Sequence, residues 1–133
     1  MVGAEIAVSS SHVPLADILD VESSTTAPAG DLEIQCVRLS RELEVLFVSA
    51  EVCSPYVGRR ESAGVHRICV GYSGDVFGYL PSEPQALEGG YEARNWFATF
   101  GTRGRMRPGF QGRVEEAMRL ASEEAAQGVA GGR

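Results

Sequence analysis

The chain has 133 residues, and its 12 Lys and Arg against 18 Asp and Glu give a formal charge of −6 at pH 7. This length is typical of one domain, and a composition of 44% hydrophobic and 23% charged residues is that of an ordinary globular protein. The acidic balance argues against nucleic acid or an anionic membrane as the main partner, and no apolar run approaches the roughly 20 residues of a membrane span.

The first 30 residues predict a flexible N-terminal arm. Residues 22–30 are small, polar and interrupted by Pro and Gly, a composition that buries too little apolar surface to be ordered. A short apolar piece over residues 13–21 is available to dock. We expect no signal peptide, because residues 1–11 have no basic stretch and carry Glu5. Three cysteines without a CxxC pair (Cys36, Cys53, Cys69) then predict reduced thiols in the cytoplasm.

Patterned sequence begins near Asp31 and predicts a mixed sheet. Residues 33–39 alternate between apolar and polar, residues 43–48 form a continuous apolar run, and the short link between them predicts an antiparallel pair. Residues 50–61 have helical spacing, and residues 66–72 form a further strand. Because a helix separates this strand from 43–48, we expect a crossover to a parallel neighbour.

The second half predicts short elements and one long helix. After a turn at 71–75 and the segment 76–80, Ser82 is placed to cap a single helical turn over 82–87. The closing helix covers about 109–127, with Gly128 just past its end and a frayed tail over 129–133. Its apolar stripe consists of Phe110, Val114, Ala117 or Met118, Ala121 and Ala125. Residues 31–128 are therefore predicted to be an α/β unit: a mixed sheet with a helix crossover and a C-terminal helix.

Several familiar catalytic motifs are missing. The sequence has no HExxH motif, no GxGxxG or GxxxxGK[ST] phosphate loop and no GxSxG nucleophile elbow. The two histidines, His12 and His66, fit surface or strand positions better than catalytic ones.

Two further clusters have a structural and a functional interpretation. The arginines between glycines near the closing helix are Arg103, Arg105, Arg107 and Arg113. The acidity of the whole chain favours a solvated loop there over an anion or partner site. The aromatic cluster consists of Trp96, Phe97 and Phe100. Such a cluster is more often part of a hydrophobic core than of a ligand-binding site.

Two glycine–tyrosine segments stand out: GYLP at 78–81 and EGGYE at 88–92. With this spacing, residues 31–127 resemble the C-terminal part of the catalytic domain of the neutral/alkaline (non-lysosomal) ceramidase family. That family has a strand pair, a PGE segment, a helix and strand, a GYxP segment, a GGYE segment and a closing helix. Ser49, Ala50 and Glu51 stand where PGE would be, so both Pro and Gly of that segment are replaced.

The resemblance implies roles for three residues. The family holds one zinc ion with two histidines, a glutamate and a tyrosine, and it cleaves N-acyl amide bonds, typically of ceramide. Glu51 and Tyr79 match the glutamate and tyrosine ligands, and oxygen donors of both kinds are acceptable to Zn²⁺. Tyr91 of GGYE matches a catalytic tyrosine whose hydroxyl donates a hydrogen bond to the substrate carbonyl. Taken singly, each residue also fits a structural role: a helix-terminal acid, a strand-end aromatic and a loop-packing aromatic.

The resemblance also implies a partner. The family's zinc histidines lie in an N-terminal part to which neither His12 nor His66 corresponds, and two ligands are fewer than the three that a catalytic zinc site needs. We therefore expect a small subunit or partial domain of a zinc-dependent amide hydrolase, inactive alone, that shares its zinc with a second chain carrying the histidines. Its substrate would be ceramide or another amide, lipid-like amides included. The alternatives are a metal-free binding or structural subunit, a homodimer, or a fragment of a longer gene.

Overall fold

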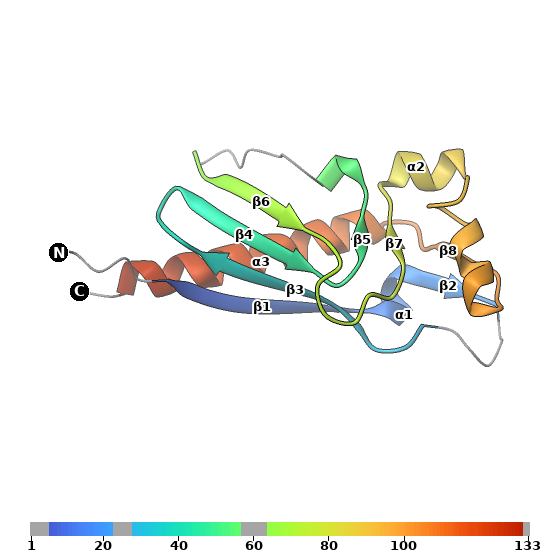
Figure 1. Cartoon of the computed structure of the whole chain (residues 1–133), viewed down its shortest axis with the longest axis horizontal. Helices are drawn as coiled ribbons and strands as arrows, with labels where there is room; N and C mark the ends of the chain where they lie inside the picture. Colours follow the sequence, from blue (N-terminus) through green and yellow to red (C-terminus); the bar gives the residue numbers. More distant parts are fainter. Residues whose placement is uncertain (1–5, 23–27, 57–63, 132–133) are drawn as a thin grey trace.

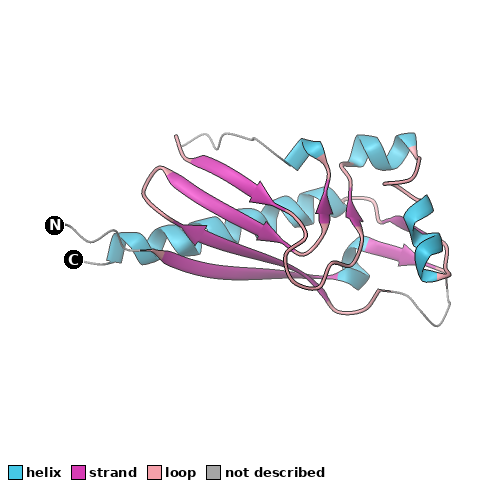
Figure 2. Cartoon of the chain, in the orientation of Figure 1, coloured by secondary structure: helices cyan, strands magenta, loops and turns pink. Residues whose placement is uncertain are grey.

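The computed structural model describes residues 6–22, 28–56 and 64–131. Figures 1 and 2 show their arrangement. The elements in chain order are β1 (Ala7–Pro14), α1 (Leu15–Ile18), β2 (Leu19–Val21), β3 (Asp31–Arg38), β4 (Leu43–Val48), β5 (Glu51–Val52), the 3₁₀ turn η1 (Ser54–Tyr56), β6 (His66–Val70), β7 (Tyr79–Leu80), α2 (Glu83–Glu88), the 3₁₀ helix η2 (Asn95–Phe100), β8 (Gly104–Met106) and α3 (Phe110–Gly131). Over these ranges, no helix combines the length and apolarity needed to cross a bilayer.

The main sheet has four strands in the order β1-β3-β4-β6. β3 and β4 form the predicted antiparallel hairpin, and β6 lies parallel to β4, as the crossover prediction required. β1 pairs antiparallel with β3 along its whole length. Two small ladders, antiparallel β2-β8 and parallel β5-β7, extend the molecule beyond one end of this sheet. The predicted class, a mixed α/β unit with a mixed sheet and a C-terminal helix, is therefore confirmed.

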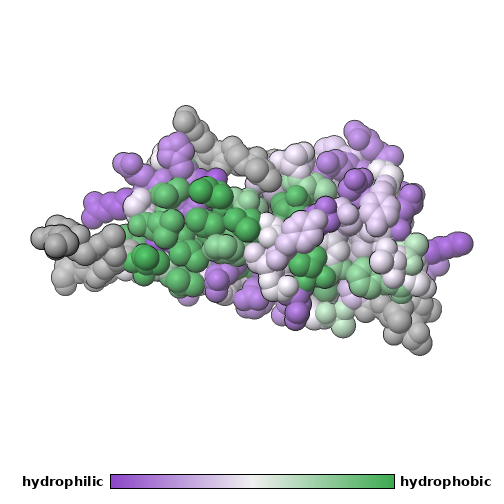
Figure 3. Space-filling model, in the orientation of Figure 1, coloured by the Kyte–Doolittle hydropathy of each residue, from purple (hydrophilic) through white to green (hydrophobic). Residues whose placement is uncertain are grey.

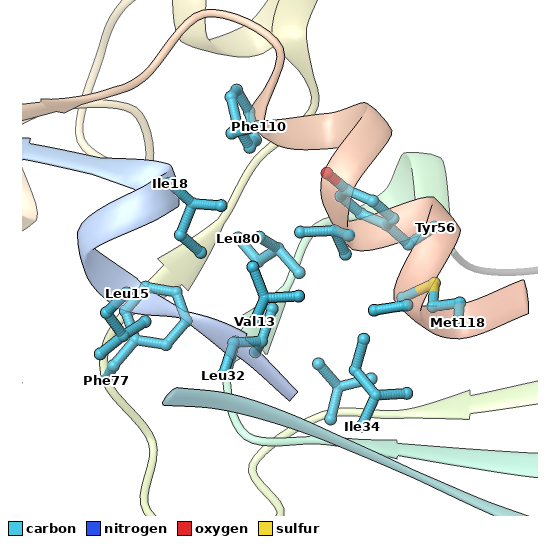
Figure 4. Packing of buried hydrophobic residues seen from close by; sticks show 14 of the residues in the cluster. Val13, Leu15, Ile18, Leu32, Ile34, Tyr56, Phe77, Leu80, Phe110 and Met118 are labelled. Carbon is cyan, nitrogen blue, oxygen red and sulfur yellow. The ribbon is translucent and has the colours of Figure 1, made fainter. Parts of the chain in front are cut away.

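One face of the main sheet is covered by α3, which packs against β1 and β3. Strand side chains alternate between faces, so every second residue of β3 and β4 points to α3 and is buried. The helix contributes the predicted stripe, from Phe110 through Val114 to Ala125. Figure 4 shows how Val13, Leu32 and Ile34 of the strands meet Phe110 and Met118 of the helix.

A buried ionic cluster joins the hairpin, β6 and α3. Glu44 is fully buried and accepts hydrogen bonds from Arg38 Nη1 at 2.5 Å, Arg67 Nε at 2.7 Å and Ser122 Oγ at 2.7 Å. Burial alone would raise the pKa of Glu44, but hydrogen bonds from Ser122 and Arg67 and the Arg67 charge outweigh it and hold this pKa below its usual range. Cys36 lies against the same carboxylate, and burial raises the pKa of its thiol to about 12.

The prediction of an arm over residues 1–30 was wrong for 7–21, which form β1, α1 and β2. Val13, Leu15 and Ile18 are core residues, and the serine-rich strand is accommodated because Ser9 Oγ donates to the Ala121 carbonyl of α3. Serine at a buried strand position is tolerated when its hydroxyl finds such an acceptor. Residues 1–5 and 23–27 lie outside the described residues.

The predicted helix over 50–61 is wrong where the chain is described. The backbone N–H groups of Glu51 and Cys53 donate to Gly78 and Leu80, so this stretch joins a β-ladder instead. Pro55, which has no N–H, follows in the single turn η1. Residues 57–63 lie outside the described residues, and the crossover helix is not present in residues 50–56.

The closing helix was predicted correctly except at its end. It runs through Gly128 to Gly131, so the frayed tail over 129–133 was wrong for 129–131. A Cβ on Gly128 would lie 2.9 Å from the Cβ of Ala7. Gly128 therefore marks a close approach between α3 and β1 rather than a helix stop.

The predicted aromatic core is confirmed at the end of the molecule beyond the sheet. Trp96 and Phe97 of η2 are buried and stack with ring centroids 3.9 Å apart.

Two of the clustered arginines join the β8 region to the N-terminal segment. Arg105 pairs with Asp20 at 2.9 Å, and Arg107 Nε donates to the carbonyls of Ala16 and Leu19.

Candidate functional site

The candidate site lies beyond the carboxyl ends of the parallel strands β4 and β6. Glu51 follows the end of β4 by three residues, and Tyr72 follows the end of β6 by two. Gly71 lets the two segments touch, because a Cβ there would lie 2.9 Å from the Ala50 carbonyl oxygen. The backbone N–H of Tyr72 donates to that carbonyl, and the Tyr72 hydroxyl lies close enough to the Glu51 side chain to interact with it electrostatically. Ligand sites in open α/β sheets favour this edge.

The β5-β7 ladder brings Tyr79 beside Glu51. The two residues are paired in register, and the Glu51 N–H donates to the Gly78 carbonyl at 2.8 Å. Gly78 has a φ of +151° and lies flat against Trp96, leaving 2.3 Å between its would-be Cβ and the indole. The Tyr79 hydroxyl also lies close enough to the Glu51 carboxylate to interact with it electrostatically. The glycine of GYLP therefore fixes the backbone from which both side chains project.

Tyr91 reaches the same place from the loop after α2. Its ring packs edge-on against Tyr79, with centroids 5.5 Å apart and planes at 81°. α2 leads into this loop and is held by a capping box between Ser82 and Gln85, and Trp96 N–H donates to the Tyr91 carbonyl. We call Glu51, Tyr72, Tyr79 and Tyr91 the Glu51 cluster.

The Glu51 carboxylate favours the protonated form of the phenols beside it. Its interaction with the Tyr79 hydroxyl and, to a smaller extent, burial raise the pKa of Tyr79 to about 12. Interaction with the same carboxylate raises the pKa of Tyr72. Burial, and then the charges of Glu92 and Glu51, raise the pKa of the nearby Cys53 thiol. In the absence of a cation, both phenols are thus protonated and neutral beside one carboxylate.

The structure brings together all three residues that the sequence singled out, Glu51, Tyr79 and Tyr91. Sequence reasoning gave Tyr72 no site role, because it assigned this residue to the end of the strand predicted over residues 66–72; the available signal was the Gly–Tyr pair at that strand end. Tyr72 is also the one non-glycine residue with positive φ (55°) in the described chain. His66 opens β6 at the opposite end of that strand, and His12 lies exposed on the outer strand β1.

The Glu51 cluster fits a zinc ion only in part. Carboxylate and phenol oxygens are hard ligands, and Tyr79 could bind as phenolate only by giving up the proton that the Glu51 carboxylate now favours. Among the described residues, no group of three or more His, Cys, Asp or Glu side chains is placed to hold a metal ion. The cluster can therefore supply two ligands, Glu51 and Tyr79, of a site completed from elsewhere.

A separate groove lies between α2, β8 and the start of α3. It encloses about 420 Å³, and its lining includes Leu87, Met106, Phe110 and the arginines at 94, 105 and 107. No member of the Glu51 cluster lines this groove.

Comparisons with protein-family models, with curated proteins and with solved structures find no match to this chain.

Proposed function

We propose that this chain is a small subunit or partial domain of a zinc-dependent amide hydrolase similar to the neutral ceramidases. The observation that carries the proposal is the convergence of Glu51, Tyr79 and Tyr91, which are 28 and 12 residues apart in sequence, at one sheet edge. The resemblance of residues 31–127 to the family implies site roles for the same three residues. An N-acyl amide hydrolase site divided between two chains would account for the convergence of these residues and for the resemblance.

In this proposal, Glu51 and Tyr79 hold the ion from one side, and a second chain supplies histidines. Bound zinc polarises a carbonyl oxygen and makes a water molecule acidic enough to act as a nucleophile near neutral pH. Tyr91 is exposed and edge-on to Tyr79, so its hydroxyl is available to donate to the substrate carbonyl oxygen as negative charge develops there. Tyr72, which interacts with Glu51, positions that carboxylate. Free thiols at all three cysteines support a reducing, cytoplasmic setting.

The second candidate is a binding or structural subunit that has kept the fold and lost the chemistry. It is favoured by the open character of the cluster, since residues 6–22, 28–56 and 64–131 contain no group of three or more His, Cys, Asp or Glu side chains placed to hold a metal ion.

Hydrolysis by the assembled protein separates the two candidates. The tagged chain is purified with its partner from the cells that make it, and release of fatty acid from an N-acyl amide is measured. Tyr91→Phe removes one hydroxyl at nearly constant volume, and we expect it to lower kcat by about 10²-fold or more, with the assembly intact. Tyr56→Phe, which removes a hydroxyl that donates to the Pro81 carbonyl, is the matched control. Equal activity of the Tyr91→Phe and control assemblies would favour the binding subunit.

A further inference from the structure

The groove between α2, β8 and the start of α3 combines an apolar lining with an excess of arginine. Its volume of about 420 Å³ lies within the roughly 300–1,000 Å³ of small-molecule sites. Its apolar lining includes Leu87, Met106 and Phe110. Three arginines and one glutamate also line it, so the local formal charge is 3 − 1 = +2 in a chain of −6. The surface that Figure 3 shows around α2 is otherwise mostly hydrophilic. We call this site the arginine groove.

A second hollow of about 370 Å³ meets the arginine groove. Arg94 and Arg105 line both hollows, and the second also has Arg103, Asp20 and Glu22 in its wall. Three arginines against two carboxylates leave this hollow with a formal charge of 3 − 2 = +1. The positive charge therefore continues from one end of the groove, while the apolar lining lies at the other.

Most of the charged groups around the groove already have partners. Arg105 pairs with Asp20 at 2.9 Å, and Arg107 Nε donates to two carbonyls of the N-terminal segment. Glu83 Oε1 accepts from a backbone N–H at the start of α3 at 2.8 Å. Arg94 differs: it is exposed, and within the described part of the chain its guanidinium has neither an ion pair nor a hydrogen bond. Arg94 is therefore the cation that is available to a ligand.

This combination selects the chemistry of the ligand. An uncharged apolar molecule would leave Arg94 without a counter-charge, and a free inorganic anion would leave the apolar lining in water. A guanidinium binds a carboxylate through two parallel hydrogen bonds. A doubly charged phosphate would in addition meet the carboxylates of Asp20 and Glu22 beside Arg94, which disfavours it. The lining thus favours one molecule with a singly charged head and an apolar chain.

We propose that the arginine groove binds an amphipathic monocarboxylate, with its carboxylate on Arg94 and its alkyl chain along Leu87, Met106 and Phe110. Removal of that chain from water provides most of the affinity, and the arginine fixes the orientation of the ligand. No member of the Glu51 cluster lines the groove, so binding here is independent of the proposed zinc site.

Titration of the full chain with octanoate, followed by ¹H–¹⁵N NMR, gives both the place of binding and its Kd. 1-Octanol has the same chain without the charge, and hexanoate has the charge with two methylene groups fewer. Arg94→Gln removes the proposed head contact. Arg41→Gln is the matched control, because it removes an exposed arginine from the β3–β4 turn, which Figure 1 shows at the opposite end of the molecule from α2 and β8.

The apolar half of the site has its own pair of variants. Leu87→Ser changes a side chain that is 85% exposed, and Leu120→Ser changes one that is 47% exposed on α3, outside the groove. Circular dichroism checks that all four variants are folded. Because both leucines are largely in water, neither change should unfold the protein.

We expect octanoate to shift backbone amides within residues 83–94 and 105–110 and to saturate. Hexanoate should bind at least fourfold more weakly, and octanol about tenfold more weakly. Arg94→Gln should weaken octanoate about tenfold and leave octanol unchanged, whereas Arg41→Gln changes neither. Leu87→Ser, but not Leu120→Ser, should weaken octanoate and octanol alike.

Three results would overturn the proposed site. Equal affinity for octanoate and octanol, or equal affinity of the Arg94→Gln and Arg41→Gln proteins, would show that no head contact exists. Shifts that do not saturate, or that fall outside residues 83–94 and 105–110, would mean non-specific partition or another site. Equal effects of the two leucine variants would remove the apolar half. None of these readouts depends on zinc or hydrolysis, so each outcome leaves the proposed function to its own test.

Discussion

Replacing Gly78 with alanine should destabilise the protein by about 2–6 kcal/mol. The new Cβ would lie 2.3 Å from one carbon of the Trp96 indole and 2.7 Å from two others. Trp96 cannot retreat, because it is buried and stacked on Phe97. Overpacking of this kind costs about 1–3 kcal/mol, and a side chain at φ +151° adds about 1–3 kcal/mol of backbone strain.

Urea unfolding followed by tryptophan fluorescence measures this cost, since Trp96 is the single tryptophan of the chain. With a slope of about 2 kcal/mol per molar urea, the midpoint should fall by about 1–3 M. Gly89→Ala is the matched control, because Gly89 also has positive φ (84°) but no atom within 4 Å of its would-be Cβ. It should lose only the strain contribution of about 1–3 kcal/mol, because its φ of 84° and ψ of −156° fall in a region that favours glycine. Equal losses in the two variants would refute the packing argument.

Three further predictions follow from the contacts described above. Glu44→Gln removes the carboxylate that Arg38 and Arg67 share as a counter-charge. It should lower the free energy of unfolding, measured in urea, by about 3–5 kcal/mol. The pKa of Glu44 is depressed in the folded state, so its contribution to the free energy of unfolding is present above the ordinary carboxyl pKa and is lost as pH falls through the folded-state pKa. The stability of the wild-type protein should therefore decline with acid more steeply than that of the variant. Parallel declines would contradict the depressed pKa of Glu44. Glu51→Gln removes the charged neighbour, so titration of tyrosinate absorbance should show the pKa of Tyr79 falling from about 12 toward 10, whereas an unchanged titration would mean that this interaction is absent. Ser82→Ala breaks the capping box of α2 and should cost about 1 kcal/mol of unfolding free energy; no loss would show that the cap is not formed in solution.

The elements that the sequence predicts well are those with strong local periodicity. The hairpin of β3 and β4 combines alternation with a short link, and α3 carries a long apolar stripe. β1 escaped prediction because its serines weaken the strand pattern and its partner, β3, begins 17 residues after β1 ends. The stretch after β4 was mistaken for a helix because its donors pair with residues 27 positions away, which periodicity does not record.

The candidate site was predicted by motif and not by geometry. The resemblance identified Glu51, Tyr79 and Tyr91, yet no local pattern indicates that a parallel two-residue ladder and a loop bring them together. Tyr72 depends on the close approach allowed by Gly71, a contact between segments 21 residues apart. That α3 covers one face of the main sheet is likewise visible only in three dimensions, because alternation predicts two faces without saying which one is covered.

The zinc content of the purified assembly, compared between Tyr79→Phe and Tyr91→Phe, tests the shared site most directly. Both variants remove one hydroxyl from the same pair of packed rings. If Tyr79 is a ligand and Tyr91 is not, the Tyr79→Phe assembly should lose most of its zinc, while the Tyr91→Phe assembly keeps about one zinc per pair of chains. Equal zinc in both variants, or none in the wild-type assembly, would contradict the proposal that this chain holds a shared metal.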